Sequence, residues 1–142
     1  MITNPSPRTT LILNVVGAGL ALLFLASGLS KLGGIPLQEH LFDAFGFPRW
    51  FMYAVGGAEL VGATLIAIPS TRPYGAMLLA VVMIGATLSR AFTGVALPLM
   101  FSDALLASTC IWIAREDRPA FLVIHWKQER EAPREFRHPV YK

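Results

Sequence analysis

The 142-residue sequence contains a single cysteine, Cys110. One cysteine excludes a disulfide within the chain, and it excludes zinc or iron–sulfur sites built from several cysteines of this chain. Cys110 lies in the middle of an apolar stretch, where we expect it to act as a small packing residue.

Charged residues are also scarce, at 15% of the chain against 54% hydrophobic residues. A soluble domain carries roughly 25% charged residues, so the composition predicts a membrane protein. The apolar residues form four runs, each near the roughly 17–25 residues that a helix needs to cross a bilayer. The runs are Leu11–Leu29, Phe51–Ile68, Tyr74–Phe92 and Ala96–Ala114. Little chain remains for a soluble catalytic domain.

Histidine is missing from all four predicted spans, because His40, His125 and His138 lie outside them. Haem ligation inside the bundle by this chain is therefore not expected. His40 lies near Glu39 and Asp43, but an exposed histidine explains this group more simply than a surface metal site. We find no glycine-rich phosphate loop and no nucleophile beside a base. The sequence predicts no metal site, no catalytic residue and no cofactor bound by ligands of its own.

The last segment, residues 115–142, carries charges of both signs. Its cations are Arg115, Arg118, Lys127, Arg130, Arg134, Arg137 and Lys142, and its anions are Glu116, Asp117, Glu129, Glu131 and Glu135. A nucleic-acid-binding arm is a more uniformly basic run, so no nucleic-acid partner is expected. We expect a polar tail that is solvated or docked on a partner subunit.

The predicted fold is all-α, an integral membrane four-helix bundle with antiparallel, up-down-up-down topology. Between the first two spans, Pro36 and Gly46 suit the start and the end of a helix. The apolar residues of this segment share one face, which predicts a short amphipathic helix on the outward-facing surface of the membrane that the chain spans. Leu11–Leu29 also resembles the core of a cleavable signal, but its length favours a retained helix.

Basic residues collect on the side of both termini and of the turn at Arg72, which places that side in the cytoplasm. We expect a multi-pass protein of the bacterial cytoplasmic (inner) membrane with both termini in the cytoplasm. Its segments are a cytoplasmic N-terminal segment (1–10), the transmembrane domain (11–114) and a cytoplasmic tail (115–142).

Each predicted span brings one charged residue to the outer half of the bundle. Glu59 lies about 12 Å along the second span and Asp103 about 10 Å along the fourth, at 1.5 Å per residue. Lys31 and Arg90 end the first and third spans on the same side. Polar side chains that fall nearby are Ser27, Ser30 and Thr87. Isolated charges are costly in lipid, so we expect these side chains to face one another.

Two interpretations of this charge cluster remain open. It is either an ion-pair network that fixes helix register, or a pocket open to the outer side. Such a pocket would bind a small polar ligand or a quinone head group, or relay protons. Small residues at Gly17 and Ala21, and at Ala54, Ala58 and Gly62, predict close helix packing. Asn14 predicts a hydrogen bond between helices.

Three stretches resemble the DoxX-like family: Ser27–Leu32 (SGLSKL), Gly57–Gly62 (GAELVG) and Tyr74–Arg90. The family often has histidine at the position of Arg90, so the chain departs from the pattern there. The resemblance implies a four-helix membrane protein, with Lys31, Glu59 and Arg90 as the matching residues. Relatives are linked to quinone-reducing sulfur oxidation, to redox-stress membrane complexes and to membrane-protein assembly.

Three functions follow as hypotheses. The first is an accessory subunit, without catalytic activity of its own, associated with an electron-transfer or oxidoreductase complex. Its expected partners are membrane lipid and larger subunits, and it would shape a quinone or lipid site at the bundle surface. The second is a protein that binds or transports a small solute through the charged pocket. The third is a quinone-linked oxidoreductase subunit that uses Glu59 and Asp103 for proton transfer.

Overall fold

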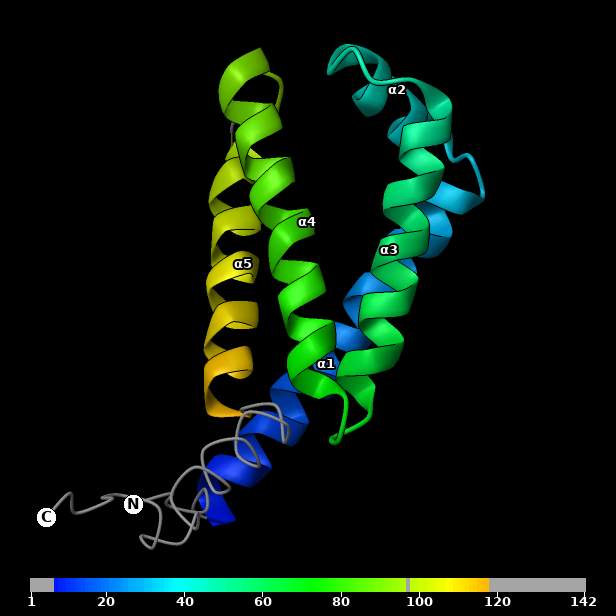
Figure 1. Cartoon of the computed structure of the whole chain (residues 1–142). Coiled ribbons are helices and arrows are strands. Elements are labelled where there is room, and N and C mark those ends of the chain that lie inside the picture. The colour runs from blue at the N-terminus through cyan, green and yellow to red at the C-terminus, as the bar shows by residue number, and fades with distance from the viewer. Residues whose placement is uncertain (1–6, 97, 118–142) are drawn as a thin grey trace, which may run out of the picture.

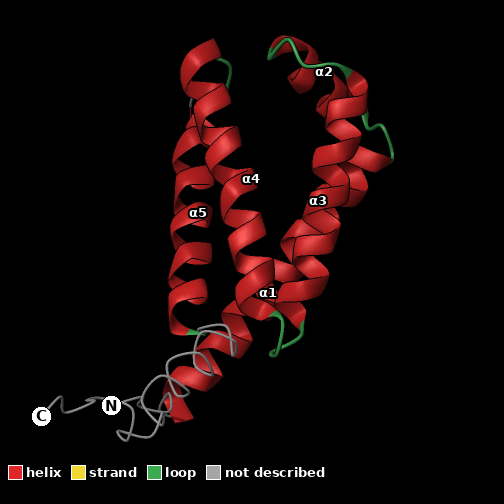
Figure 2. Ribbon diagram, viewed as in Figure 1, coloured by secondary structure: helices red, strands yellow, loops and turns green. Residues whose placement is uncertain are grey.

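The computed structural model describes residues 7–96 and 98–117, and every regular element in these ranges is an α-helix. The helices are α1 (Pro7–Leu32), α2 (Pro36–Ala44), α3 (Arg49–Ala67), α4 (Arg72–Thr93) and α5 (Pro98–Glu116). Figure 2 shows them joined by short loops. The predicted all-α class is confirmed. Most of the predicted tail, including His125 and His138, lies outside the described residues.

Proline and glycine set the helix boundaries. Pro36 and Pro73 lie in the first turns of α2 and α4, where a missing backbone N–H leaves no hydrogen bond unmade. Gly94 ends α4 with φ 71°, a left-handed conformation that glycine adopts without steric cost. Its N–H donates to the carbonyl oxygen of Arg90 at 2.9 Å. The chain therefore turns back toward α5 directly after Thr93.

Three of the helices are long and apolar enough to cross a membrane: α1 from Arg8, α3 and α4. The fourth predicted span also folds as a helix, α5, but it does not reach the hydropathy of the other three. Its sequence includes Asp103 near the start and Arg115 and Glu116 at the end.

The helices pack as two pairs. α1 packs along α3, α4 packs along α5, and contacts between α3 and α4 join the pairs. In Figure 1 the pairs meet near the turn between α3 and α4 and diverge toward the end that holds α2 and the α4–α5 turn. We call these the closed end and the open end.

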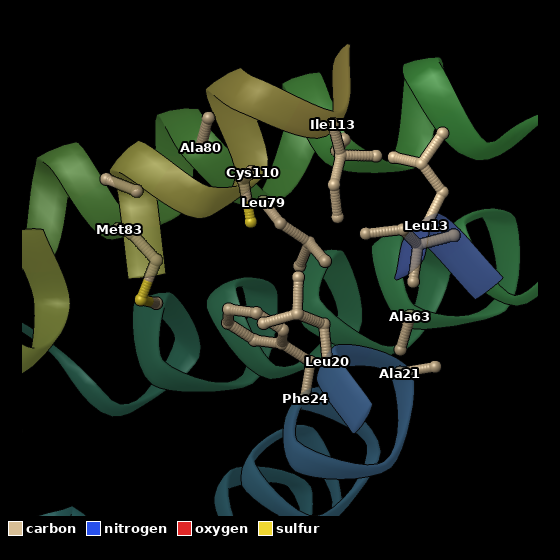
Figure 3. Packing of buried hydrophobic residues seen from close by; sticks show 13 residues of the cluster. Leu13, Leu20, Ala21, Phe24, Ala63, Leu79, Ala80, Met83, Cys110 and Ile113 are labelled. Carbon is tan, nitrogen blue, oxygen red and sulfur yellow. The ribbon is translucent and has the colours of Figure 1, made fainter. Parts of the chain in front are cut away.

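An apolar core lies where the two pairs meet, and Figure 3 shows its side chains converging from four helices. Phe24 of α1 and Leu79 of α4 are among its largest fully buried members. Leu79 packs on Gly62 of α3, where an added Cβ would lie 2.6 Å from Leu79 Cγ. The remaining members are Leu13, Leu20, Ala21, Ala63, Ile66, Ala76, Ala80, Met83, Ala107, Cys110 and Ile113.

The small-residue stripe predicted on α3 is partly wrong. Gly62 is buried as expected, but Ala54 is exposed and Ala58 only half-buried. The α3 glycines at which an added Cβ would meet a neighbouring helix are Gly56 and Gly62. Both α1 and α4 pack on α3, so its buried face is set by two neighbours and is rotated from the predicted stripe.

Candidate functional site

Lys31 and Glu59 form a buried ion pair between α1 and α3. Lys31 Nζ donates to both carboxylate oxygens of Glu59, at 3.1 and 2.9 Å, and to Ser27 Oγ at 2.8 Å. An ammonium group has three hydrogens, so all of its donors have acceptors here. Glu59 is 1% exposed. The carboxylate is therefore enclosed, and the Lys31 ammonium, whose side chain is 10% exposed, is fully hydrogen-bonded.

Glycines allow this pair to form. Ser27 and Lys31 are four residues apart on α1, so their side chains share a face. Near them, an added Cβ at Gly28 would lie 2.8 Å from the carbonyl oxygen of Gly56, and one at Gly56 would lie 2.9 Å from Lys31 Cβ. The two backbones approach closely at this crossing, and the lysine reaches the carboxylate one turn further along α3.

The predicted supporting serine Ser30 links α2 to this region. Its hydroxyl donates to the carbonyl oxygen of Ser27 at 2.7 Å and accepts a hydrogen bond from Gln38 Nε2 at 3.2 Å. Ser30 therefore links α2 to the end of α1, and within the described residues its hydroxyl makes no hydrogen bond to Lys31 or Glu59.

Arg90 and Asp103 form the second ion pair, between α4 and α5. Arg90 Nε lies 2.5 Å from Asp103 Oδ2, and each side chain is 12% exposed. The ring centroid of Phe45, which directly follows α2, lies 5.6 Å from Arg90 Cζ, within the range of a cation–π contact. The predicted supporting residue Thr87 donates to the carbonyl oxygen of Met83 at 2.8 Å.

The four predicted charges are thus arranged as two ion pairs, one in each helix pair. Within residues 7–96 and 98–117, no hydrogen bond or ion pair joins Lys31–Glu59 to Arg90–Asp103. Lys31 lies in the last turn of α1 and Arg90 in the last turn of α4. These helix ends belong to the open end, where the helix pairs diverge (Figure 1). Each charge therefore finds its partner on the helix with which its own helix packs most extensively.

A third polar network, which the sequence did not reveal, lies at the closed end. Arg72 is 5% exposed and donates through all three of its nitrogens. Nε donates to the carbonyl oxygen of Ile66 at 3.3 Å, Nη1 to Asp117 Oδ2 at 3.0 Å and Nη2 to Asn14 Oδ1 at 2.9 Å. One guanidinium thereby connects α4 with α1, with α3 and with the residue that follows α5. The interhelical hydrogen bond predicted for Asn14 is confirmed.

The sequence places Arg72 between Pro69 and Pro73, which predicts a residue of a short turn and not a buried one. The sequence feature that could have indicated a buried Arg72 is Gly17, which lies one turn after Asn14 on α1. An added Cβ at Gly17 would lie 3.3 Å from Arg72 Nε, so the glycine leaves room for the guanidinium.

Aromatic rings collect beside the second ion pair. The rings of Phe42, Phe45, Phe47 and Phe51 lie 4.8–6.4 Å apart between neighbouring centroids, and Trp50 contacts Phe51 edge-on. We call these five residues the aromatic cluster. Through Phe45 it provides an apolar wall next to the Arg90 guanidinium.

No group of three or more His, Cys, Asp and Glu side chains in the described ranges is arranged to hold a metal ion. Glu39 pairs instead with the exposed Arg49, at 2.8 Å. Cys110 is a buried free thiol of the apolar core.

The sequence model of the DoxX-like family matches residues 15–112, which is about two thirds of the chain. The matched range includes all three stretches that carried the predicted resemblance, and it includes both ion pairs of the open end. No curated protein and no solved structure matches the chain.

Proposed function

This chain belongs to the DoxX-like family of membrane proteins, and we propose that it is an accessory, non-catalytic subunit of an electron-transfer or oxidoreductase complex. In this role it stabilises the assembly of larger subunits in the bacterial cytoplasmic membrane. It also shapes a quinone or lipid site at its surface.

The observation that carries the proposal is the Lys31–Glu59 ion pair. Both oxygens of Glu59 accept hydrogen bonds from a single ammonium, and the carboxylate is closed to solvent. A proton relay needs a donor on one side and an acceptor on the other, and a solute site needs free polar groups. This pair instead holds α1 against α3. That supports an architectural role over solute transport or proton transfer.

For the topology we propose an antiparallel four-helix bundle in which α5 is the fourth span. The Arg90–Asp103 pair lies near the end of α4 and the start of α5, whereas the Arg72–Asp117 pair lies at the start of α4 and beyond the end of α5. These contacts support opposite directions for the two helices. With four spans, the N-terminal segment (1–10) and the tail (115–142) both lie in the cytoplasm.

The surface offered to partners is the apolar outside of the bundle. Large apolar side chains are exposed on every long helix, and they include Leu22, Val61, Val81, Phe92, Phe101 and Leu105. In the proposed complex, part of this surface contacts lipid and part contacts larger subunits. We propose the tail, most of which lies outside the described residues, as a further docking segment.

Extraction in mild detergent tests this proposal. The full chain, carrying an affinity tag, is purified from its native membrane, and a tagged membrane protein of similar size serves as the control. We expect larger subunits with redox cofactors to copurify with this chain in fixed stoichiometry and not with the control. Recovery of the chain alone would contradict the accessory role.

A double variant separates the architectural role from proton transfer. Lys31→Met with Glu59→Leu removes both charges together, so neither is left unpaired in the bundle. If the pair is architectural, the variant restores complex assembly and electron-transfer activity in a strain that lacks the chain. An assembled complex without activity would instead favour the quinone-linked enzyme hypothesis.

A further inference from the structure

Lys31 and Arg72 are buried and Arg90 is largely buried, and these three cations differ in how completely they are hydrogen-bonded. Arg72 uses all three of its nitrogens, and Lys31 has an acceptor for each of its three hydrogens. Arg90 bonds to another described residue only through Nε. Its Nη1 is buried and has no hydrogen-bond partner within residues 7–96 and 98–117.

This difference singles out Arg90. Buried donors in native proteins nearly always have an acceptor, and a charged donor without one is especially costly. Nε already donates to Asp103, so an acceptor for the edge formed by Nη1 and Nη2 has to come from outside the ion pair. A guanidinium edge of this kind donates two parallel hydrogen bonds to a suitable oxygen-bearing group.

The surroundings define the chemistry of that acceptor. Asp103 already neutralises Arg90, so a bound anion would leave excess negative charge in a largely buried site. An uncharged carbonyl oxygen satisfies the donors without this cost. Phe45 places a ring of the aromatic cluster over the guanidinium, so the rest of the ligand meets an apolar wall.

The depth of the site indicates where such a ligand comes from. Arg90 is three residues before the end of α4, or about 5 Å along the helix axis. In the proposed topology this position lies near the boundary between the hydrocarbon core and the interfacial region. Molecules dissolved in the membrane present carbonyl groups at this level.

We propose that Arg90 binds the carbonyl oxygen of an uncharged group on a membrane-dissolved molecule, with the aromatic cluster covering the bound end. The inference rests on the proposed function and topology. It names Arg90 as the binding residue of the proposed quinone or lipid site and a carbonyl oxygen as the group that is bound. Two sources supply this carbonyl: the ester of a glycerophospholipid and the ring carbonyl of a quinone.

The test compares the full-length wild-type chain with Arg90→Lys and Arg72→Lys. Lysine at position 90 keeps the charge opposite Asp103 but lacks the guanidinium edge. One arm measures binding of a short-chain benzoquinone to the chain in nanodiscs of ether-linked lipid, which lack ester carbonyls, by quenching of tryptophan fluorescence. The other arm uses native mass spectrometry to count retained phospholipid, comparing ester-linked with ether-linked lipids.

We expect at least one probe to bind saturably to the wild type and about ten- to a hundredfold more weakly to Arg90→Lys, the usual effect of losing a charged hydrogen bond. Arg72→Lys should bind that probe like the wild type. Preference for ester-linked lipid identifies a phospholipid, and saturable benzoquinone binding in ether-linked lipid identifies a quinone.

Equal binding by wild type and Arg90→Lys, or no saturable binding of either probe, would overturn the inference. If Arg90→Lys does not fold, Arg90→Met with Asp103→Leu removes both charges and should show the same loss. Copurification of partner subunits is measured separately, so either proposal can fail without the other.

Discussion

Glu59 and Lys31 depend on each other because both charges are buried between α1 and α3. Removing one member of a buried ion pair leaves the other uncompensated, whereas removing both can be neutral or stabilising. Glu39 and Arg49 provide the natural comparison, because Arg49 is 63% exposed in that pair. Exposed pairs contribute only about 0–1 kcal/mol.

Glu59→Gln should lower the free energy of unfolding by about 3–5 kcal/mol, because the Lys31 ammonium stays buried opposite a neutral amide. Denaturant unfolding of the purified chain in detergent, followed by circular dichroism, measures this change. Glu39→Gln is the matched control and should change the stability by no more than about 1 kcal/mol. Equal effects of the two substitutions would show that burial of the Lys31–Glu59 pair does not determine its strength.

At the scale of helices, glycine decides how closely neighbours approach. An added Cβ at Gly75 of α4 would lie 2.6 Å from the backbone nitrogen of Ile66 and 2.7 Å from the carbonyl oxygen of Gly62. Backbone atoms cannot rotate away as a side chain can, so the two helices would have to separate. Gly85, on the same helix, has nothing within 4 Å of an added Cβ.

Gly75→Ala should therefore destabilise the chain by about 1–3 kcal/mol, the usual cost of overpacking. Gly85→Ala should be neutral or stabilise it by up to about 1 kcal/mol, because alanine is the better helix former. Both variants are compared with the wild type by thermal unfolding in the same detergent. A stable Gly75→Ala variant would mean that the α3–α4 crossing is looser than the structure indicates.

At the scale of the whole molecule, the apolar core and Arg72 join the two helix pairs. The other buried charges form ion pairs within one helix pair or the other. Each ion pair of the open end stays within one helix pair, whereas Arg72 crosses between them. A lysine at this position has one nitrogen and cannot reach acceptors on three sides in the fixed geometry of a guanidinium.

Arg72→Lys should lower the free energy of unfolding by at least about 1.5–3 kcal/mol, the contribution of one hydrogen bond to a charged group. The variant should also become more susceptible to proteolysis at the closed end, measured by limited digestion and mass spectrometry. Arg49→Lys, at an exposed pair, is the control. Unchanged stability of Arg72→Lys would indicate that the core alone holds the two pairs together.

The proposed topology predicts where the chain ends lie. A fluorescent-protein fusion at the C-terminus should be bright and a phosphatase fusion there inactive, because both report a cytoplasmic location. The N-terminus should give the same result. If α5 does not span the membrane, the two termini would report opposite sides, because α1, α3 and α4 alone make three crossings.

Much of the architecture could be predicted from the composition and from the positions of proline and glycine. Long apolar runs have few alternatives to helices in a membrane, and prolines and glycines mark the boundaries because they restrict or free the backbone. The pairing of the four charges within two helix pairs was not predictable. The position of a residue in a span gives its depth in the membrane. It does not show which helices pack together and which diverge, and this decides which charges pair.

The sequence by itself determined that the chain is helical and apolar and that Lys31, Glu59, Arg90 and Asp103 need partners, because an unpaired charge is costly in lipid wherever it lies. Only the tertiary structure decided how each need is met. It paired Lys31 with Glu59, bound every nitrogen of Arg72 and left Arg90 with a buried donor, because acceptors come from helices far apart in sequence. Hydrogen bonds require contact within about 3 Å, and only packing sets which groups come that close.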